Sequence, residues 1–282
     1  MDKFTRNNNP ASIAVVVVIY GSKLTSCNVY NTLIKNNIDN ISCLLVFDNS
    51  QTKQYEKIDL PNGKYEYFWN PSNPGLSVHY NEAARYARQH GYEWILLSDQ
   101  DTTFPPEAMA EYEKALTENL DCSLFVPIHK ISGDRFLSPV RSCIWKQTTC
   151  IKPGMHKIKE YDIINSGMLI KVADFIKAGG YKEDVNLDFS DFQFIERLKR
   201  VTKNFIVLNI ECIQDFSNNA EDKAKLISRF KKYCQNAANF ETRSIYTKAR
   251  ISYLVLKHTI ALSVRCKTTE TFKILVKSII KK

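Results

Sequence analysis

The run IAVVVVI, residues 13–19, constrains the fold more than any other part of the sequence, because all seven side chains are apolar. A strand buried on both faces has this pattern, and β-branched residues favour it. Apolar runs follow at 41–50, 65–70 and 93–101, and the segment 76–90 has helical spacing. Strands that alternate with helices predict an α/β fold with a Rossmann-like, mostly parallel mixed sheet flanked by helices.

The second half of the chain continues this pattern less regularly. We expect helices at 106–118 and 189–201, and strands at 123–130, 161–172 and 205–213. Residues 131–160 contain Gly, Pro, Ser and Lys without a clear period, which predicts a surface excursion over one end of the sheet. These patterns predict a sheet domain over residues 1–219, with a first half at about 11–105 and a second at about 106–219. A basic, mainly helical extension is expected over residues 220–282.

Composition places the chain among globular proteins, since 44% of its 282 residues are hydrophobic and 24% are charged. No stretch approaches the roughly 20 apolar residues of a membrane span. The run at 12–21 lacks the cleavage site of a signal peptide. The cysteines stand singly, without C-x-x-C or zinc-ligand spacing, which predicts reduced thiols in a cytoplasmic protein; they lie at 27, 43, 122, 143, 150, 212, 234 and 266.

Polar residues follow three of the four early strands, at Asp48–Asn49, Asn70 and Asp99–Asp101. Ligands of parallel sheets bind beyond the carboxyl ends of the strands, so these positions predict a binding site at that edge. Neither G-x-G-x-x-G nor a P-loop follows the first strand. The phosphates of a bound nucleotide must therefore be held in another way.

The two carboxylates of SDQDT, Asp99 and Asp101, lie one residue apart at a strand end. Mg²⁺ and Mn²⁺ prefer oxygen ligands, and Mg²⁺ commonly takes one or two carboxylates while substrate phosphates complete its shell. The pair therefore fits a cation that bridges a diphosphate. Helix capping or a turn is the alternative interpretation of Asp101.

Four blocks in a fixed order give the chain a resemblance to a known family. They are VVVVIYGS, LLVFDNS, NPGLSVHYNEAARYA before WILLSDQDTTFPP, and INSGMLI with AGGYKEDVNLDFSDFQFIERL. Over roughly residues 12–216 the chain resembles the family 2 glycosyltransferases of the GT-A fold, and more narrowly their rhamnosyltransferase-like branch. The resemblance implies inverting transfer of a sugar from a nucleotide-diphospho-sugar, dTDP-rhamnose or a UDP-sugar, to an acceptor hydroxyl.

The same resemblance implies roles for particular residues. Those at the nucleotide are Tyr20, Asp48, Asn49, Asn73, Gly75, Asn81 and Asp99. The cation, Mn²⁺ or Mg²⁺, is expected at Asp99 and Asp101, with Gln214 and Asp215 as further candidate ligands from a later strand end. Asp191 in FSDFQF corresponds to the catalytic base. The acceptor site is expected to include Asn165, Ser166, Gly167, Gly180, Tyr181 and Asp188.

Two positions depart from the family pattern. Gln193 stands where a second acid often follows the base, and Gln214 stands where a histidine often binds the metal. No histidine of the chain is a convincing substitute, and we expect all five to be surface or packing residues; they are His79, His90, His129, His156 and His258. For Asp191 itself the alternative is an acid favoured by the helix dipole.

Charge divides the chain sharply. Residues 221–282 hold 15 Lys and Arg against 4 Asp and Glu, whereas residues 1–220 hold 24 against 26. Basic and aromatic residues interleave in this extension, which suits an amphipathic helix on an anionic membrane or a phosphorylated substrate. A solvated helix face, packing on the sheet domain or contact with a second subunit are the alternatives. No nucleic-acid-binding motif accompanies the charge.

The sequence therefore predicts a metal-dependent hexosyltransferase with a glycan or lipid-linked acceptor, working in bacterial surface polysaccharide synthesis. It would be cytoplasmic, or peripheral at the inner face of the cytoplasmic membrane. A catalytically impaired member acting as a binding subunit is one rival, and it would explain Gln193 and Gln214. A sugar nucleotidyltransferase is the other, although YGSKL after the first strand is a poor match to its Gly-rich loop.

Overall fold

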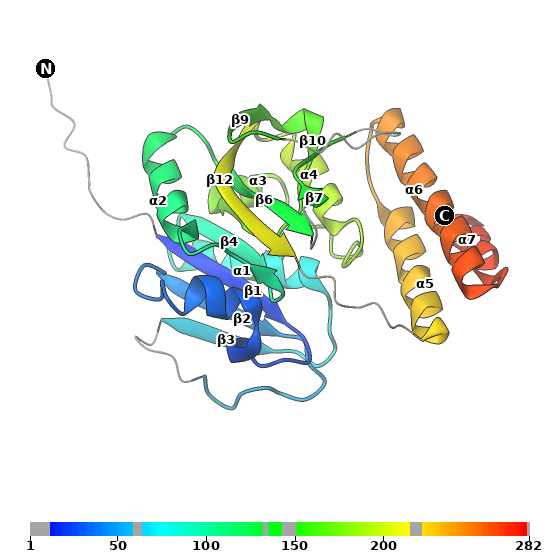
Figure 1. Ribbon diagram of the computed structural model, residues 1–282, viewed down its shortest axis with the longest axis horizontal. Helices are drawn as coiled ribbons and strands as arrows, with labels where there is room; N and C mark the ends of the chain where they lie inside the picture. Colours follow the sequence, from blue (N-terminus) through cyan, green and yellow to red (C-terminus); the bar gives the residue numbers. More distant parts are fainter. Residues whose placement is uncertain (1–11, 59–63, 132–134, 143–150, 215–221, 281–282) are drawn as a thin grey trace, which may run out of the picture.

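A mixed sheet of ten strands forms the body of the protein in a computed structural model that describes residues 12–58, 64–131, 135–142, 151–214 and 222–280 (Figure 1). The strands of this sheet are β1 (Ile13–Ile19), β2 (Cys43–Asp48), β3 (Tyr65–Trp69), β4 (Trp94–Asp99), β5 (Thr102–Thr103), β6 (Leu124–Ile131), β7 (Arg135–Ser138), β9 (Gly154–Lys157), β11 (Met168–Lys171) and β12 (Asn204–Gln214). Their order is β3-β2-β1-β4-β11-β6-β12-β5, with β7 paired to β6 and β9 to β12. A separate pair joins β8 (Val140–Arg141) to β10 (Tyr161–Asp162).

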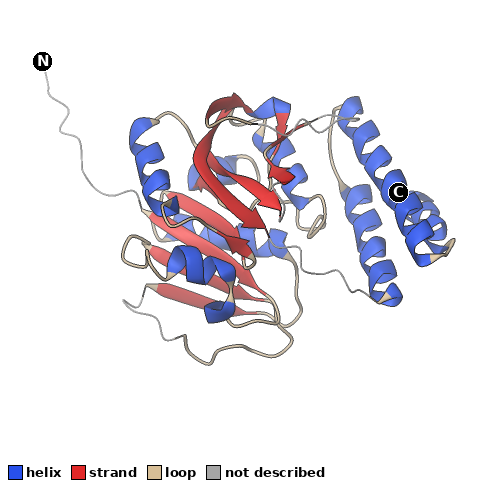
Figure 2. Ribbon diagram, viewed as in Figure 1, coloured by secondary structure: helices blue, strands red, loops and turns tan. Residues whose placement is uncertain are grey.

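Helices cover the sheet and then extend beyond it (Figure 2). In the sheet domain they are α1 (Leu76–Gln89), α2 (Ala108–Glu118), α3 (Val172–Lys177) and α4 (Ser190–Leu198), with short helical turns at Leu24–Ser26, Tyr30–Ile34 and Ile158–Glu160. The extension consists of α5 (Lys223–Asn239), α6 (Ile245–Cys266) and α7 (Glu270–Ile280). The expected helical extension is therefore confirmed.

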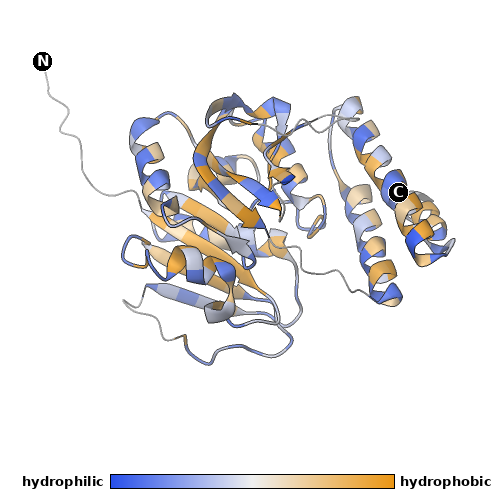
Figure 3. Cartoon of the chain, viewed as in Figure 1, coloured by the Kyte–Doolittle hydropathy of each residue, from blue (hydrophilic) through white to orange (hydrophobic). Residues whose placement is uncertain are grey.

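The first half of the sheet is parallel, as its apolar runs predict. β1 pairs with β2 on one side and with β4 on the other, so that Val16 lies opposite Leu45 and Leu97. Val15 and Val17 pack in one core cluster, which includes residues of α2, and Val16 packs in a second cluster on the other face, which includes residues of α1. Figure 3 shows β1 and β4 as mostly hydrophobic along their length. Strands with apolar side chains on both sides can be covered on both faces of the sheet.

The second half of the sheet differs from the sequence prediction in two places. β11 runs antiparallel to both β4 and β6, and the expected strand at 161–172 is broken into β10 and β11 by the turn at 163–167. Among the described residues of the segment 131–160, β7 and β9 join the sheet by pairing with β6 and β12. Period-two patterns do not detect strands of only four residues reliably, because so few positions alternate.

The extension is joined to the sheet domain by an apolar cluster and a buried ion pair. Val185 and Phe189, in the loop before α4, pack with Phe230 of α5 and Val255 of α6. Nearer the start of α6, the guanidinium of Arg250 donates to the carboxylate of Asp162, and both side chains are buried. Removal of either partner would leave an uncompensated buried charge.

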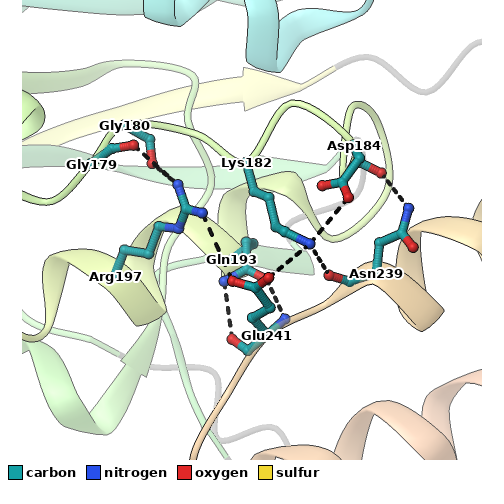
Figure 4. A network of polar contacts seen from close by, with 8 residues as sticks. All are labelled: Gly179, Gly180, Lys182, Asp184, Gln193, Arg197, Asn239 and Glu241. Carbon is teal, nitrogen blue, oxygen red and sulfur yellow. Dashed lines mark hydrogen bonds and ion pairs between the residues drawn. The ribbon is translucent and has the colours of Figure 1, made fainter. Parts of the chain in front are cut away.

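A polar network strengthens the same joint (Figure 4). The amide of Gln193 on α4 forms two hydrogen bonds with the backbone of Glu241, which lies between α5 and α6: Nε2 donates to the carbonyl at 3.0 Å, and Oε1 accepts from the N–H at 2.6 Å. Lys182 forms an ion pair with Glu241 at 3.1 Å and donates to the carbonyl of Asn239 at 2.8 Å. An acid in place of Gln193 could not donate to that carbonyl, so this departure from the family pattern has a structural reason.

Two further predictions can be compared with the described residues. The cysteines at 27, 43, 122, 212, 234 and 266 are buried and free, which agrees with reduced thiols, whereas Cys143 and Cys150 lie outside the described residues. Among the helices that the structure describes, none combines the length and the apolar character needed to cross a bilayer.

Candidate active site

A cavity of about 680 Å³ lies where the carboxyl ends of β1, β2 and β4 meet helices α5 and α6. Its walls come from three sources: strand ends, the loops beside α1 and α4, and the helical extension. The strand-end and loop residues are Val18, Tyr20, Asn49, Asn73, Gly75, Leu76, Asp99, Gln100, Asp101, Leu187, Asp188 and Gln214. The extension contributes Leu226, Arg229, Phe230, Tyr233, His258, Leu262 and Arg265.

Asp99 ends β4 and is held by polar groups from two other elements. Its Oδ1 accepts hydrogen bonds from the hydroxyl of Tyr80 and from Nδ2 of Asn165, each at 3.1 Å, and its N–H donates to the hydroxyl of Ser166 at 3.1 Å. Burial and the nearby charge of Asp101 raise the pKa of Asp99 to about 6. The carboxylate is therefore fixed in position, but its negative charge is poorly compensated.

Asp101 lies at the cavity and is oriented by Gln214 at the end of β12. Nε2 of Gln214 donates to Oδ1 of Asp101 at 2.6 Å, while Oε1 of Gln214 accepts from the hydroxyl of Thr102 at 2.6 Å. The side-chain nitrogen of Gln214 therefore orients the carboxylate of Asp101, and the side-chain oxygen of Gln214 faces Thr102 and not a cation shared with Asp101. Asp215, the other candidate from this strand end, lies outside the described residues.

The two acids fit a hard cation that takes few protein ligands. Within the described ranges no cluster of three or more His, Cys, Asp or Glu side chains could hold a metal by itself. Mg²⁺ sites commonly use one or two carboxylates together with water and substrate phosphates. Burial, and then the like charge of Asp101, disfavour the ionised form of Asp99, and a bound cation would offset both effects.

Asp191 lies in the first turn of α4, close to the same acids. Burial and then the charge of Asp99 raise the pKa of Asp191 to about 8, against the effect of hydrogen bonds from the N–H of Asn165 and from Ser190. Asn165 therefore connects the two carboxylates, since its side chain donates to Asp99 and its backbone donates to Asp191. A carboxylate with a pKa near the working pH is suited to accept a proton from an acceptor hydroxyl.

Five of the seven residues that the sequence assigned to a nucleotide line the cavity: Tyr20, Asn49, Asn73, Gly75 and Asp99. The N–H of Tyr20 donates to Oε1 of Gln100, the residue between the two acids, at 2.8 Å. Gly75 has a φ of 99°, and a Cβ there would lie 2.7 Å from the carbonyl oxygen of Asn186. Only glycine allows these two loops to approach so closely.

Two predicted nucleotide contacts are engaged elsewhere and do not line the cavity. Asp48 is fully buried, and its two oxygens accept hydrogen bonds from the backbone of Ser50 and Gln54 and from the hydroxyl of Tyr67. Asn81 exchanges hydrogen bonds with the backbone of Tyr181, at 2.8 and 2.9 Å. Both residues support the shape of the site from behind its surface.

The residues assigned to the acceptor also divide into two groups. Asp188 lines the cavity, whereas Asn165, Ser166 and Gly167 lie beneath the acids: Ser166 shares a 2.6 Å hydrogen bond with Thr102, and Gly167 donates its N–H to the carbonyl of Leu97. Tyr181, next to Gly180, is buried and stacks on Phe194 with 4.4 Å between the ring centroids. Sequence order did not distinguish residues that line the cavity from residues that support it.

Sequence reasoning missed the wall formed by the extension. His258 is exposed and packs on the rings of Phe230 and Tyr233, as expected of a surface or packing residue, and it also lines the cavity with Arg229, Tyr233 and Arg265. It also missed Tyr80, which is fully buried and donates to Asp99. The available signal for Tyr80 was its position on the same face of α1 as Ala83, Ala84 and Ala87, which face the sheet. No local signal indicated which basic residues of the extension would face the strand ends.

The chain is similar to a known protein family in sequence and to solved structures in fold. Residues 14–177 match the family model described as Glycosyl transferase family 2, while no curated protein matches the chain. The structure is similar to TarS (residues 1–349) of S. aureus in complex with UDP-GlcNAc, with a TM-score of 0.59 and 12% identity over 95% of this chain and 79% of that chain. It is also similar to the mannosyltransferase PcManGT of Pyrobaculum calidifontis in complex with GDP-Man and Mn²⁺, with a TM-score of 0.54 and 13% identity over 97% of this chain and 81% of that chain.

The mixed sheet with acids at the end of β4 is therefore a GT-A glycosyltransferase fold, as expected from the sequence. Because the family model covers more than half of the 282 residues, the chain belongs to glycosyl transferase family 2. The narrower resemblance to the rhamnosyltransferase-like branch stays a prediction.

Proposed function

We propose that this protein is an inverting glycosyltransferase that moves a sugar from a nucleotide-diphospho-sugar to a hydroxyl group of a glycan or a lipid-linked acceptor. The observation that carries the proposal is the grouping of Asp99 and Asp101 at the cavity with Asp191 beside them. The complexes of similar structures with UDP-GlcNAc and GDP-Man support a nucleotide-sugar donor. A UDP-sugar or dTDP-rhamnose is the donor that the sequence favours.

The chemistry assigns a different task to each acid. Asp191 accepts the proton of the acceptor hydroxyl while the oxygen attacks the anomeric carbon, and the bond from that carbon to the diphosphate oxygen breaks. Asp99 and Asp101 would hold Mn²⁺ or Mg²⁺, which supplies positive charge to the leaving diphosphate. One displacement of this kind inverts the configuration at the anomeric carbon.

The amides that departed from the family pattern give little support to a catalytically impaired protein. Gln193 binds the backbone of Glu241, and Gln214 orients Asp101. Each amide therefore has a polar task that an acid or a histidine would not perform in the same way. A sugar nucleotidyltransferase is the weaker alternative, because the first strand is followed by Tyr20, Gly21 and Ser22 and not by a Gly-rich loop.

The extension supports peripheral membrane association as part of the same proposal. Leu256, Ile260 and Val264 are exposed on α6 at intervals of four residues, and Phe272 and Val276 are exposed on α7 at the same interval. Apolar side chains on one helix face among many Lys and Arg suit an anionic lipid surface. Sedimentation with phosphatidylglycerol vesicles, but not with phosphatidylcholine vesicles, would agree with a cytoplasmic protein bound at a bacterial membrane during surface polysaccharide synthesis.

The activity is tested by nucleotide release from a panel that includes UDP-GlcNAc, GDP-mannose and dTDP-rhamnose, with Mn²⁺ and with a chelator. Asp191→Asn is expected to lower the rate roughly 10²- to 10⁴-fold, because general-base catalysis has that size. Nucleotide binding should persist in this variant. Asp121→Asn, an exposed acid outside the cavity, is the matched control. Undiminished release by Asp191→Asn would remove Asp191 from the role of base.

A further inference from the structure

Two arginines make the wall of the cavity opposite the strand-end acids cationic: Arg229 on α5 and Arg265 on α6. His258 of α6 lines the same wall, but burial lowers the pKa of its imidazole, so the positive charge comes from the arginines. The chain up to residue 220 has more acidic than basic side chains, so the extension is the source of this positive charge. A neutral sugar needs no such wall, whereas a phosphoryl group does.

The loop before α4 holds this wall against the site. Burial raises the pKa of Asp188, and the neighbouring Arg229 and then His258 act against that shift. Oδ2 of Asp188 is buried without a hydrogen-bond partner among the described residues. The ring of Tyr233 lies 4.7 Å from that of Phe189 and 4.6 Å from that of His258. His258 therefore packs against an aromatic ring of α5, and Arg229 interacts with the charge of Asp188, while both residues stay exposed.

Phe189 shows how closely this loop is constrained. Its φ of 67° is a left-handed conformation that a bulky side chain rarely adopts, and the residue is nonetheless buried against the extension. Such backbone conformations persist where the surrounding structure over-determines them, often beside functional sites. The strained residue lies between Asp188, which faces the cationic wall, and Asp191, the proposed base.

Arg265 is the residue of the wall that is best placed to bind a ligand. It lies in the last turn of α6, its side chain is exposed to the cavity, and no ion pair or hydrogen bond to it is found within the described part of the chain. A guanidinium presents several N–H donors in a planar fork that matches phosphate oxygens. Arg265 and Arg229 can therefore contact one phosphoryl group from two helices.

We propose that α5 and α6 form a phosphate-binding wall, in which Arg229 and Arg265, with His258 beside them, bind phosphoryl oxygens of a ligand that occupies the cavity. This inference rests on the proposed glycosyl transfer and extends it, since it assigns a binding role to residues outside the segment that matches the family. The phosphoryl group belongs either to the diphosphate of the donor or to a phosphate carried by the acceptor. The chemistry of recognition is the same in both cases.

The test uses calorimetric titration of the full chain with three probes: inorganic diphosphate with Mg²⁺, then UDP, GDP and dTDP with Mn²⁺, and finally inorganic phosphate added to the nucleotide-saturated protein. Arg265→Ala and Arg229→Ala are each expected to weaken diphosphate binding about tenfold, because each removes charge-assisted hydrogen bonds. Arg265→Lys should weaken it less. Arg243→Ala, which removes an exposed arginine of the extension that does not line the cavity, is the matched control and should bind like the wild type.

The probes distinguish the two sources of the phosphoryl group. If it belongs to the donor, the two alanine variants also lose about tenfold in affinity for the nucleoside diphosphate. If it belongs to the acceptor, that affinity is unchanged, and the variants instead lose the binding of phosphate to the saturated protein. Equal unfolding midpoints of the Arg265 variants and the wild type would show that the loss is not one of folding.

The proposal is overturned if the wild type does not bind inorganic diphosphate, or if the Arg265 and Arg229 variants bind all probes as well as the Arg243 variant does. Failure of the proposed function gives a different result. In that case no nucleotide sugar is consumed, while diphosphate binding that depends on Arg265 can still be measured.

Discussion

The strand ends and the helical extension face the same cavity, yet their residues are held there in different ways. Asp99 is held among polar groups that leave its charge poorly compensated. Burial and then the charge of Asp99 raise the pKa of Asp191 to about 8. The extension is held by contacts that are satisfied: the pair of Asp162 with Arg250, and the hydrogen bonds of Gln193 with Glu241. The comparison indicates that the strand-end acids cost the folded state free energy, whereas the joint with the extension contributes to its stability.

The largest expected effect comes from breaking the buried pair of the joint. Arg250→Met leaves the carboxylate of Asp162 buried without its partner, which typically costs about 3–5 kcal/mol. The free energy of unfolding from urea titration should fall by that amount. Adding Asp162→Leu to the same chain should recover part of it, because the unpaired charge is then removed. A loss below 1 kcal/mol would mean that the joint does not depend on this pair.

A smaller effect is expected from restoring the family's acid at residue 193. Gln193→Glu loses the donor to the carbonyl of Glu241 and brings a carboxylate to that oxygen, so the free energy of unfolding should fall by about 1–3 kcal/mol. Protease cleavage between α5 and α6 should become faster. Gln89→Glu, at the end of α1, makes the same change at an exposed side chain and should alter neither quantity. Unchanged stability of the residue 193 variant would mean that the amide of Gln193 does not stabilise the contact between the sheet domain and the extension.

A third effect concerns the strand-end side of the comparison, and it depends on pH. The pKa of Asp191 is about 8 in the folded protein and about 3.9 in an unfolded chain, so between these values the folded state binds more protons. Stability present at low pH is therefore lost as the pH rises through 8. Asp191→Asn removes this loss, so the variant should gain stability over the wild type between pH 5 and pH 9. Urea titrations at both pH values measure the difference, and a constant difference would contradict the raised pKa.

The parts of the site that the sequence predicted are those whose signal is local. Asp99 and Asp101 follow an apolar run directly, and parallel strands bring their carboxyl ends to one edge of the sheet, so the position of these acids follows from the fold class. Asn73 and Gly75 belong to one short turn beside the same edge. The central strands and the helices of the extension were predicted for the same reason, because each rests on a periodic pattern of its own.

The parts that could not be predicted depend on contacts between residues far apart in the chain. Gln193 forms hydrogen bonds with the backbone of Glu241, and Asp188 lies near Arg229 of α5 and His258 of α6. No local sequence pattern predicts that these residues come close together. The same limit applied to the supporting residues. The family resemblance implied ligand contacts for Asn165 and Asn81, but only the three-dimensional arrangement shows that their amides bind other parts of the protein.

The apolar cluster that joins Val185 and Phe189 to α5 and α6 also has a consequence for the way the protein is made. Helices α5 and α6 are synthesised after the loop before α4, so the apolar side chains of this loop stay uncovered until both helices have left the exit tunnel. Chaperone binding to nascent chains should therefore persist until α6 has emerged. Termination of the chain within α6 would leave part of this apolar cluster exposed to solvent, so the truncated protein should aggregate.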